Sequence, residues 1–295
     1  MTSATTTSTP TATSTSTSTP TPTSTSTPKP LALVTGASNG IGLELAKQFA
    51  GHGYDLLIAA EPEGLEQAAS TLRAHAGSAG ADRATDVTTV GTDLATYDGV
   101  EELVRAVESA GRPVDAAALH AGIGVGGDFT ETDLATELEM IELNVSAVVH
   151  LAKRLVPAMK ARGQGRILIT SSIAATQPSP YEAVYAATKS FTQSFAEALR
   201  QELRGTGVTV TALMPGPTET NFFARAGMLD TKIGSSSKDG PALVAKQGYE
   251  ALMAGEQKRF AGGLMSKALG ISGAFVPDSV KATAHKLLAR PGSAN

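Results

Sequence analysis

Short apolar runs alternate along this chain with segments whose apolar residues recur every three or four positions. A short apolar, β-branched run is typical of a buried strand, and the longer spacing is typical of a helix. The expected strands cover residues 31–35, 55–60, 87–94, 114–119, 166–171 and 208–214, and the expected helices cover residues 40–50, 65–75, 100–109, 137–162 and 184–204. This alternation predicts an α/β fold, a doubly wound parallel sheet with helices on both faces.

The chain begins with a segment of different composition. Residues 1–28 contain 14 Thr, 7 Ser and 4 Pro, with Met1 as the one large apolar side chain. Such a segment buries too little apolar surface to offset the entropy lost on ordering, so we expect it to be disordered. It lacks the basic and apolar regions of a secretory signal, and an O-glycosylated stalk is a weaker alternative. We expect a single α/β domain at 29–262 and a helical C-terminal extension at 263–295.

The overall composition excludes several classes of protein. The formal net charge of −4 gives no electrostatic basis for binding nucleic acid or an anionic membrane. There is no cysteine, so disulfides, thiolate catalysis and cysteine-based metal sites are ruled out. No apolar run reaches the roughly 18 residues of a membrane span. The histidines show no HExxH spacing, so we expect no metal site, no nucleic-acid or membrane partner, and a cytoplasmic location.

A glycine-rich turn follows the first strand. Residues 35–42 read TGASNGIG, which places glycines where a chain must turn tightly, approach a pyrophosphate and pack a helix on a strand. The phosphates then meet the positive end of the helix that begins near Gly40. The alternative is a purely structural turn. The cofactor contacts predicted here are Gly36, Ser38, Asn39, Gly40, Ile41 and Gly42.

An acidic residue follows the second strand. Glu61 lies 19 residues after Gly42 (61 − 42), and the dinucleotide pattern expects an acid about 20 residues on, bonded to the adenosine ribose hydroxyls. A carboxylate there repels the additional phosphate of NADP, and the neutral Asn39 supplies no cation to hold that phosphate. We therefore expect NAD(P) as the cofactor, with NAD favoured over NADP. The alternative is that Glu61 is a solvated loop carboxylate.

Three polar residues later in the chain suit proton transfer to a substrate oxygen. Tyr185 and Lys189 lie four apart at the start of a predicted helix, so their side chains share one face. A free tyrosine has a pKa of about 10, and a neighbouring ammonium favours the phenolate. Ser172 lies at the carboxyl end of the preceding strand, where such sheets gather reactive groups. Its hydroxyl can hold the substrate oxygen while Tyr185 moves the proton, and a cofactor supplies the hydride chemistry.

With these motifs in this order, residues 31–224 resemble the short-chain dehydrogenases/reductases. TGASNGIG is similar to the family's glycine turn, and YAATK, from Tyr185 to Lys189, is similar to its YxxxK motif. Ser172 lies 13 residues upstream of Tyr185 (185 − 172), where the family carries its catalytic serine. Asn144 is similar to the family's helix asparagine, which anchors a water on the proton path from the lysine. The resemblance implies a Rossmann-like domain with these four residues as catalytic groups.

The resemblance also implies further cofactor contacts. Asp93 and Leu94 are similar to the pair that lies beside the adenine, and the residues after Pro215 are similar to the segment that binds the nicotinamide carboxamide. Where the family usually carries Asn-Asn-Ala-Gly, this chain has Leu-His-Ala-Gly. Either His120 replaces a bracing hydrogen bond, or the cofactor lies in a slightly different position. The cofactor contacts implied in this way are Asp93, Leu94, His120, Ala121, Gly122, Tyr185, Lys189, Pro215, Gly216, Thr218 and Thr220.

The sequence therefore predicts an NAD(P)-dependent oxidoreductase that interconverts a secondary alcohol and a carbonyl. The alternatives are a dinucleotide-binding regulatory or scaffold protein, and a family member that reduces a C=C bond or acts as an epimerase. Segment 216–240 is typical of a substrate lid, and the alternative is a plain surface insertion. From Gly263 onward we expect weakly amphipathic helix and no chemistry. By resemblance, the helices that begin at Glu137 and Val184 pair subunits in a homodimer or homotetramer. Apolar residues predict a hydrophobic carbonyl substrate: Val125, Pro178, Tyr181, Phe222, Phe223 and Met228.

Overall fold

The computed structural model describes residues 1–7, 29–78, 84–272 and 276–294. Most of the Thr/Ser/Pro tail, residues 8–28, for which we expect disorder, lies outside the described residues. Residues 1–7 are exposed and form neither helix nor strand. The first strand begins at Leu31.

Seven parallel strands form one sheet in the order β3-β2-β1-β4-β5-β6-β7. The central strands are buried on both faces, which is why they read as continuous apolar runs rather than alternating ones. The predicted doubly wound α/β fold is confirmed. The strands are β1 Leu31–Thr35, β2 Asp55–Ala60, β3 Val87–Gly91, β4 Val114–Leu119, β5 Gly165–Thr170, β6 Val208–Pro215 and β7 Lys258–Ala261.

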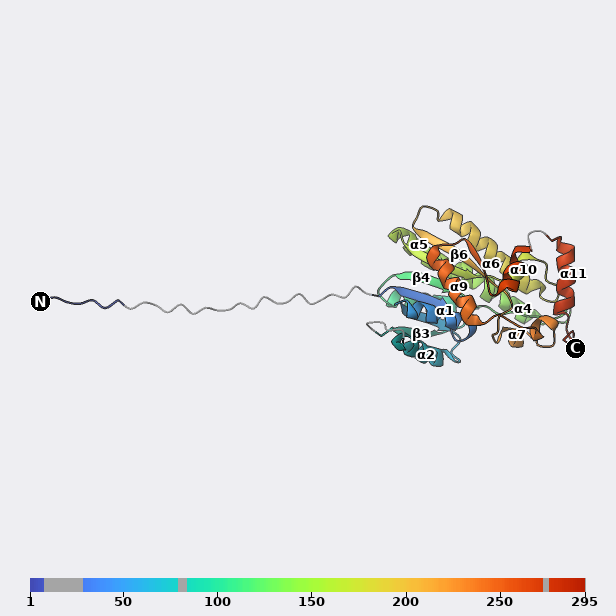
Figure 1. Cartoon of the computed structure of the whole chain (residues 1–295), viewed down its shortest axis with the longest axis horizontal. Coiled ribbons are helices and arrows are strands. Elements are labelled where there is room, and N and C mark those ends of the chain that lie inside the picture. Colours follow the sequence, from blue (N-terminus) through green and yellow to red (C-terminus); the bar gives the residue numbers. More distant parts are fainter. Residues whose placement is uncertain (8–28, 79–83, 273–275, 295) are drawn as a thin grey trace.

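Helices cover both faces of the sheet (Figure 1). On one face α1, α2 and α9 form a core that includes Leu45 and Val244, and on the other α3, α5 and α6 form a core that includes Leu103 and Leu151. The helices are α1 Gly40–Gly51, α2 Leu65–Ser78, α3 Tyr97–Ser109, α4 Leu134–Ile141, α5 Ala147–Arg162, α6 Ala183–Glu202, α7 Phe222–Arg225, α8 Lys232–Ser235, α9 Pro241–Ala254, α10 Leu264–Ser272 and α11 Asp278–Ala289.

Two predicted elements differ from the structure. Strand β3 ends at Gly91, and the chain then turns into α3, whose first turn is capped by the Thr96 hydroxyl accepting from Gly99 N at 3.0 Å. The helix predicted over 137–162 is two helices, α4 and α5, separated by the π-helical turn Glu142–Ser146. Tertiary hydrogen bonds to a side chain inside that turn, described below, favour this geometry.

Helix α9 and strand β7 lie in a part of the chain where no element was predicted. Helix α9 contains Gly248, where an added Cβ would lie only 3.0 Å from the Leu213 side chain of β6. Glycine has poor helix propensity, but at this position it allows α9 to pack closely on β6. Strand β7 has only four residues and forms by pairing with β6. Both elements therefore depend on the sheet that they complete.

The strand order reverses between β1 and β4, so the connections from these two strands leave in opposite directions. In open α/β sheets, ligands bind at the carboxyl ends of the strands beside such a reversal. Figure 1 shows α7, α10 and α11 gathered at one end of the body. The carboxyl ends of the strands and these helices enclose a cavity of about 1260 Å³.

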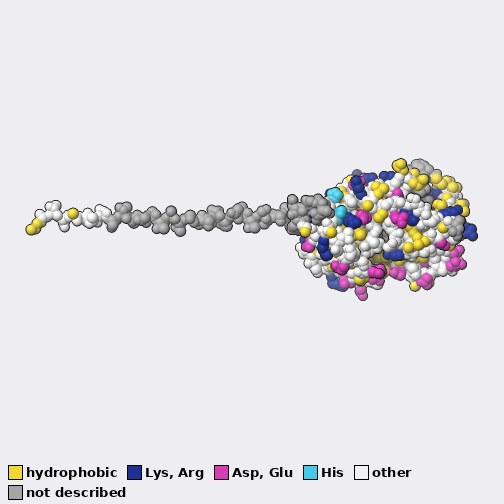
Figure 2. Space-filling model, turned by 60° about the horizontal axis from the view of Figure 1, so that its bottom comes forward, with side chains coloured by type: hydrophobic (Ala, Val, Ile, Leu, Met, Phe, Trp, Pro, Cys, Tyr) yellow, Lys and Arg dark blue, Asp and Glu magenta, His cyan; other side chains and the backbone are white. Residues whose placement is uncertain are grey.

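The surface carries charges of both signs. Figure 2 shows basic side chains scattered among acidic and apolar ones, so the face in view offers no continuous basic stripe of the kind that binds a phosphate backbone. Within the described residues, no helix is both long and apolar enough to cross a membrane.

Candidate active site

The large cavity is lined by loops that follow β1, β2, β3, β4, β5 and β6. Its volume exceeds the roughly 300–1,000 Å³ typical of small-molecule pockets, which leaves room for a dinucleotide and a second molecule. Of the predicted site residues, Gly42 and Asn144 do not line it. Those that do are Gly36, Ser38, Asn39, Gly40, Ile41, Glu61, Asp93, Leu94, His120, Ala121, Gly122, Ser172, Tyr185, Lys189, Pro215, Gly216, Thr218 and Thr220.

The glycine turn brings backbone to the cavity where side chains would not fit. Gly36 and Gly40 have φ of +68° and +56°, and a Cβ on Gly36 would lie 2.9 Å from the Ala121 Cα. Gly42 lies behind the turn, where a Cβ would lie 2.0 Å from the Gly36 carbonyl oxygen, so it packs α1 and makes no contact with the cavity. Asn39 provides no side-chain cap to α1. An uncapped helix start that opens onto a cavity fits a pyrophosphate.

The loops after β2 and β3 make this end of the cavity acidic. Glu61 directly follows β2 and is exposed, and Glu63 lines the same wall. Asp93 and Leu94 lie in the loop after β3, where the Asp93 carboxylate accepts from Ala95 N at 2.9 Å. Three carboxylates at one end disfavour an additional anionic group there.

Ser172, Tyr185 and Lys189 meet on one side of the cavity. Tyr185 and Lys189 lie one turn apart on α6, with Lys189 Nζ 5.7 Å from the centre of the Tyr185 ring. Lys189 Nζ also donates to the Thr170 carbonyl at 3.3 Å, which ties the ammonium to the end of β5. Ser172 follows β5 and hydrogen-bonds with the Tyr185 side chain. The three side chains predicted from spacing are thus brought together by α6 and β5.

Burial governs the protonation of this pair. It raises the pKa of Tyr185 above its usual value, the Glu182 charge raises it further, and the hydrogen bond with Ser172 lowers it. Burial also lowers the pKa of Lys189 to about 8. At neutral pH the site therefore holds a phenol beside an ammonium, an arrangement that can donate a proton to an oxygen that is gaining negative charge.

Asn144 lies behind the cavity wall, in the π-helical turn. Its Nδ2 donates to the Ile123 carbonyl at 2.9 Å and to Thr188 Oγ1 at 3.1 Å, and its Oδ1 accepts from Ile123 N at 3.0 Å. The buried amide thus holds the loop after β4 against α6. Its role in a proton relay stays a prediction.

His120 joins three strands at the base of the cavity. Its backbone N donates to Thr35 Oγ1 at 2.9 Å, and its ring Nδ1 lies 3.1 Å from Thr170 Oγ1. Burial is the main cause that lowers the pKa of His120 to about 3, and the charges of Lys189 and Arg225 contribute to the same shift. The imidazole is therefore neutral at physiological pH.

We expect stability to fall below pH 6.5, with a contribution from His120. The folded protein keeps this imidazole neutral down to a pH of about 3, whereas the unfolded chain binds the proton near pH 6.5. Acid thus favours unfolding across this window, by about 1.4 kcal/mol per pH unit for one group. Urea unfolding from pH 8 to 4.5 should give a shallower fall in the free energy of unfolding for His120→Asn than for wild type. Above pH 6.5 the two curves should run parallel, and parallel curves below it would contradict this assignment.

The apolar wall of the cavity differs from the predicted one. Phe222 and Phe223 line it, and the Phe222 ring centre lies 5.2 Å from that of Tyr185. The other four residues of that prediction are misplaced: Val125, Tyr181 and Met228 lie outside the lining, and Pro178 lines a separate pocket. Much of the apolar lining that was missed comes from the C-terminal helices, in the region after Gly263 where no site residue was expected. It includes Ile173, Ala174, Ile233, Met265, Val276, Val280, Ala284 and Leu288.

Three polar residues of the cavity wall were not predicted as site residues from the sequence. His285 Nε2 lies 2.9 Å from Glu182 Oε2, and Gln177 Nε2 lies 3.3 Å from His285 Nδ1. No local pattern links residues 103 positions apart. The detectable feature was the apolar spacing from Val280 to Leu288 on α11. Among the described residues, no three His, Asp or Glu side chains gather where they could hold a metal ion.

Comparisons with known proteins agree with this geometry. Residues 30–228 match the family model for short chain dehydrogenases. The chain is 33% identical over 203 residues to a short chain dehydrogenase from Pseudocercospora fijiensis, a match that covers 68% of this chain and 63% of that protein. It is 29% identical over 225 residues to the ketoacyl reductase HetN from Nostoc sp., covering 75% of this chain and 74% of that protein. The chain therefore spans less than two thirds of the first of these relatives.

Solved structures give the same grouping. A short-chain dehydrogenase from Sphingobium yanoikuyae in complex with NADPH superposes with a TM-score of 0.70 at 26% identity, covering 78% of this chain and 86% of that one. A short chain dehydrogenase/reductase from Burkholderia phymatum in complex with NAD also gives a TM-score of 0.70 at 26% identity, covering 78% of this chain and 88% of that one.

Proposed function

The chain belongs to the short chain dehydrogenase family, and we propose that it interconverts a secondary alcohol and a carbonyl with NAD(P) as cofactor. The observation that carries this proposal is the meeting of Ser172, Tyr185 and Lys189 in the cavity that also contains the glycine turn. One end of the cavity suits a dinucleotide and the other suits proton transfer. Relatives solved with NADPH and with NAD support the general cofactor class.

Each polar residue has a distinct task in this mechanism. A dinucleotide held in this cavity would supply the hydride chemistry. The Ser172 hydroxyl donates a hydrogen bond to the substrate oxygen, and Tyr185 Oη gives that oxygen its proton during reduction and removes it during oxidation. The Lys189 ammonium, held by the Thr170 carbonyl, stabilises the phenolate that Tyr185 becomes after giving up its proton.

The residues around the glycine turn would hold the cofactor. The start of α1 would take the pyrophosphate, and the segment after β6 would take the nicotinamide end through Pro215, Gly216, Thr218 and Thr220. This segment lies close to the turn, because a Cβ on Gly40 would lie 3.0 Å from Thr220 Cγ2. Lys189 would contact the nicotinamide ribose. The binding residues thus come from both sides of the strand reversal.

We expect NAD to bind more tightly than NADP, by roughly tenfold at low ionic strength. The reason is repulsion between the 2′-phosphate and the carboxylates at the β2 end, which salt will partly screen. Calorimetric titration of both cofactors into wild type and Glu61→Gln tests this. The substitution should tighten NADP binding and narrow the difference. Glu108→Gln, on α3 and outside the cavity lining, serves as the charge-matched control. Equal affinity of wild type for both cofactors would contradict the preference.

An activity panel separates this function from the alternatives. Wild type is assayed with ketones, secondary alcohols, α,β-unsaturated carbonyls and epimerisable sugars. Turnover of ketones and alcohols supports the proposal. Turnover restricted to C=C bonds or to epimerisable sugars supports a C=C reductase or an epimerase. Cofactor binding without any turnover supports a regulatory or scaffold protein.

Assembly and location are further parts of the proposal. We propose a homodimer or homotetramer that pairs through the segment 137–162, which contains most of α4 and all of α5, and through α6. The supporting observation is that these helices expose Leu134, Leu138 and Phe191. A cytoplasmic location stays a prediction.

A further inference from the structure

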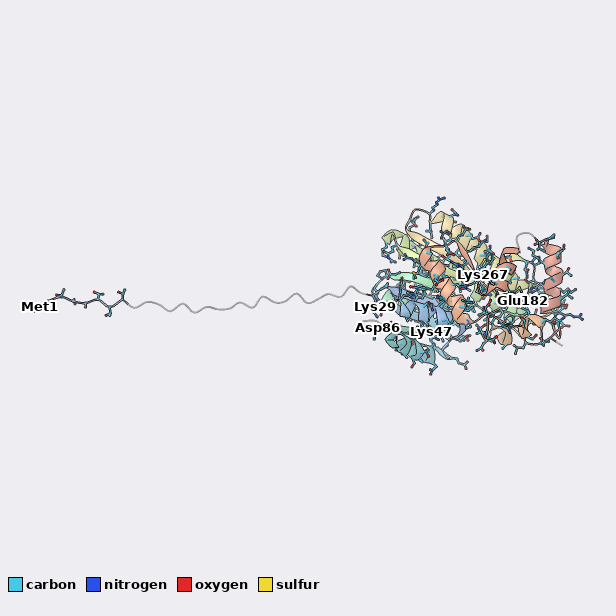
Figure 3. All side chains as sticks on the ribbon, in the orientation of Figure 1. Met1, Lys29, Lys47, Asp86, Glu182 and Lys267 are labelled. Carbon is cyan, nitrogen blue, oxygen red and sulfur yellow. The ribbon has the colours of Figure 1, made fainter. Side chains whose placement is uncertain are left out.

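Helix α11 is fastened to the segment that carries the proton-transfer residues. Lys281 Nζ donates to the Thr176 carbonyl at 3.0 Å, and His285 Nε2 lies 2.9 Å from Glu182 Oε2. Both acceptors lie in residues 172–185, which connect the Ser172 hydroxyl to the Tyr185 phenol. Figure 3 labels Glu182 at the end of the body where α11 lies. Two side chains one turn apart on α11 thus hydrogen-bond with this segment.

The other end of α11 and the residues just after it contact segment 216–240. Ala289 is buried in a cluster with Phe223, and Gly292 N donates to Asp230 Oδ2 at 2.7 Å. Helix α11 therefore joins the two segments that border the phenol side of the cavity.

The Glu182–His285 pair is built as a defined contact. Both residues are only 5% exposed, and a carboxylate buried to this extent is costly without a partner. The Gln177 amide lies 3.3 Å from the remaining ring nitrogen. Tyr181, just before Glu182, has φ of +67°, the left-handed region that non-glycine residues rarely adopt, and its carbonyl accepts from Gly127 N at 2.9 Å. These contacts over-determine the position of the Glu182 carboxylate.

The face of α11 turned to the cavity carries a row of apolar residues beside Lys281 and His285. Val280, Ala284 and Leu288 lie four residues apart and all line the cavity, as does Met265 of α10. Val280 and Leu288 are about half exposed, so the core of the protein does not cover their side chains. Binding is favoured when an apolar ligand covers apolar surface in a cavity wall, because that surface is removed from water.

We propose that α11 is the specificity-determining wall of the substrate pocket, held in place by the Glu182–His285 pair, and that it selects carbonyl substrates with an apolar chain. This inference rests on the proposed function. Glu182 and His285 act as positioning residues: they hold α11 over the cavity and fix its distance from the proton donor. The substrate chain then lies along Val280, Ala284 and Leu288 while its carbonyl faces Tyr185.

The test compares variants on a series of methyl ketones from 2-butanone to 2-decanone. Wild-type kcat/KM should rise with chain length, and His285→Ala should lose roughly tenfold on the longest ketone through KM, with little change on the shortest. His285→Gln, which can still donate to Glu182, should recover most of the loss. Leu288→Ala, which leaves the pair intact, should show the same chain-length effect. Leu287→Ala, on the exposed side of α11, is the matched control and should behave as wild type.

A loss that is equal for short and long ketones, or no loss in either His285→Ala or Leu288→Ala, would overturn the proposal. Amide hydrogen exchange gives a readout independent of turnover. It should rise in α11 and in residues 176–182 of His285→Ala and stay unchanged in Leu287→Ala, while an unchanged cofactor affinity shows that each variant is folded. If wild type reduces no ketone, the proposed function fails. If amide hydrogen exchange is unchanged in His285→Ala, the Glu182–His285 pair does not hold α11 in place, whatever the activity of the variant.

Discussion

Tyr185→Phe is expected to lower the rate of ketone reduction by about 10²–10⁴-fold while leaving cofactor affinity close to that of wild type. The substitution removes the phenol proton and the hydrogen bond with Ser172, and general acid catalysis accounts for an effect of this size. The phenyl ring keeps the contact with Phe222, whose centre lies 5.2 Å away, so the pocket should retain its shape. Steady-state kinetics and calorimetric titration of the cofactor measure the two quantities separately.

Tyr249→Phe is the matched control for this substitution. Tyr249 is also buried, packs edge-to-face on Phe49 at 5.2 Å between ring centres, and lies outside the cavity lining. It should keep wild-type activity. A Tyr185→Phe enzyme that retained most of its turnover would refute the assignment of Tyr185 as the acid/base, whereas loss of cofactor binding as well would point to a collapsed site.

Gly42→Ala is expected to weaken cofactor binding by at least about tenfold and to destabilise the fold by roughly 1–3 kcal/mol. The added Cβ would lie 2.0 Å from the Gly36 carbonyl oxygen and 2.8 Å from His120 Cδ2. Neither the turn nor the half-buried imidazole can move without changing the backbone that faces the cavity. Calorimetric titration with NAD and urea unfolding report the two effects.

Gly51→Ala provides the comparison on the same helix. Gly51 is the last residue of α1, is exposed, and would place its Cβ 3.8 Å from His75 Nε2, an ordinary contact distance. This variant should bind NAD as wild type does. If Gly42→Ala bound NAD within about twofold of wild type, the glycine turn would not be the pyrophosphate site.

The fold was largely predictable because its information is local. The inner strands are short apolar runs, and the helices between them carry apolar residues at helical spacing, so each element could be assigned from its own residues. The parallel order follows from their alternation. The family assignment from the glycine turn and the YxxxK motif is confirmed by the match over residues 30–228. The residue roles carried over from that family are predictions that the experiments above test.

Elements that depend on distant partners were not predictable in the same way. The π-helical turn interrupts a segment with uninterrupted helical periodicity because Asn144 hydrogen-bonds with Ile123, a residue 21 positions away. Strand β7 forms because β6 offers an unpaired edge. The predicted apolar wall failed for a related reason, since the direction of side chains in an irregular loop is set by packing and not by sequence spacing.

By itself the sequence determined the α/β order, the glycine turn and the pairing of Tyr185 with Lys189, because each is encoded within a single strand, turn or helix face. The tertiary structure alone decided that Gly42 packs against the Gly36 carbonyl outside the cavity lining, that His120 is neutral, and that Glu182 meets His285. Those outcomes depend on which segments the fold brings together and on how much water it excludes. Contacts between residues about a hundred positions apart, and the burial that they produce, give no periodic pattern in the sequence. They can therefore be identified only in the folded molecule.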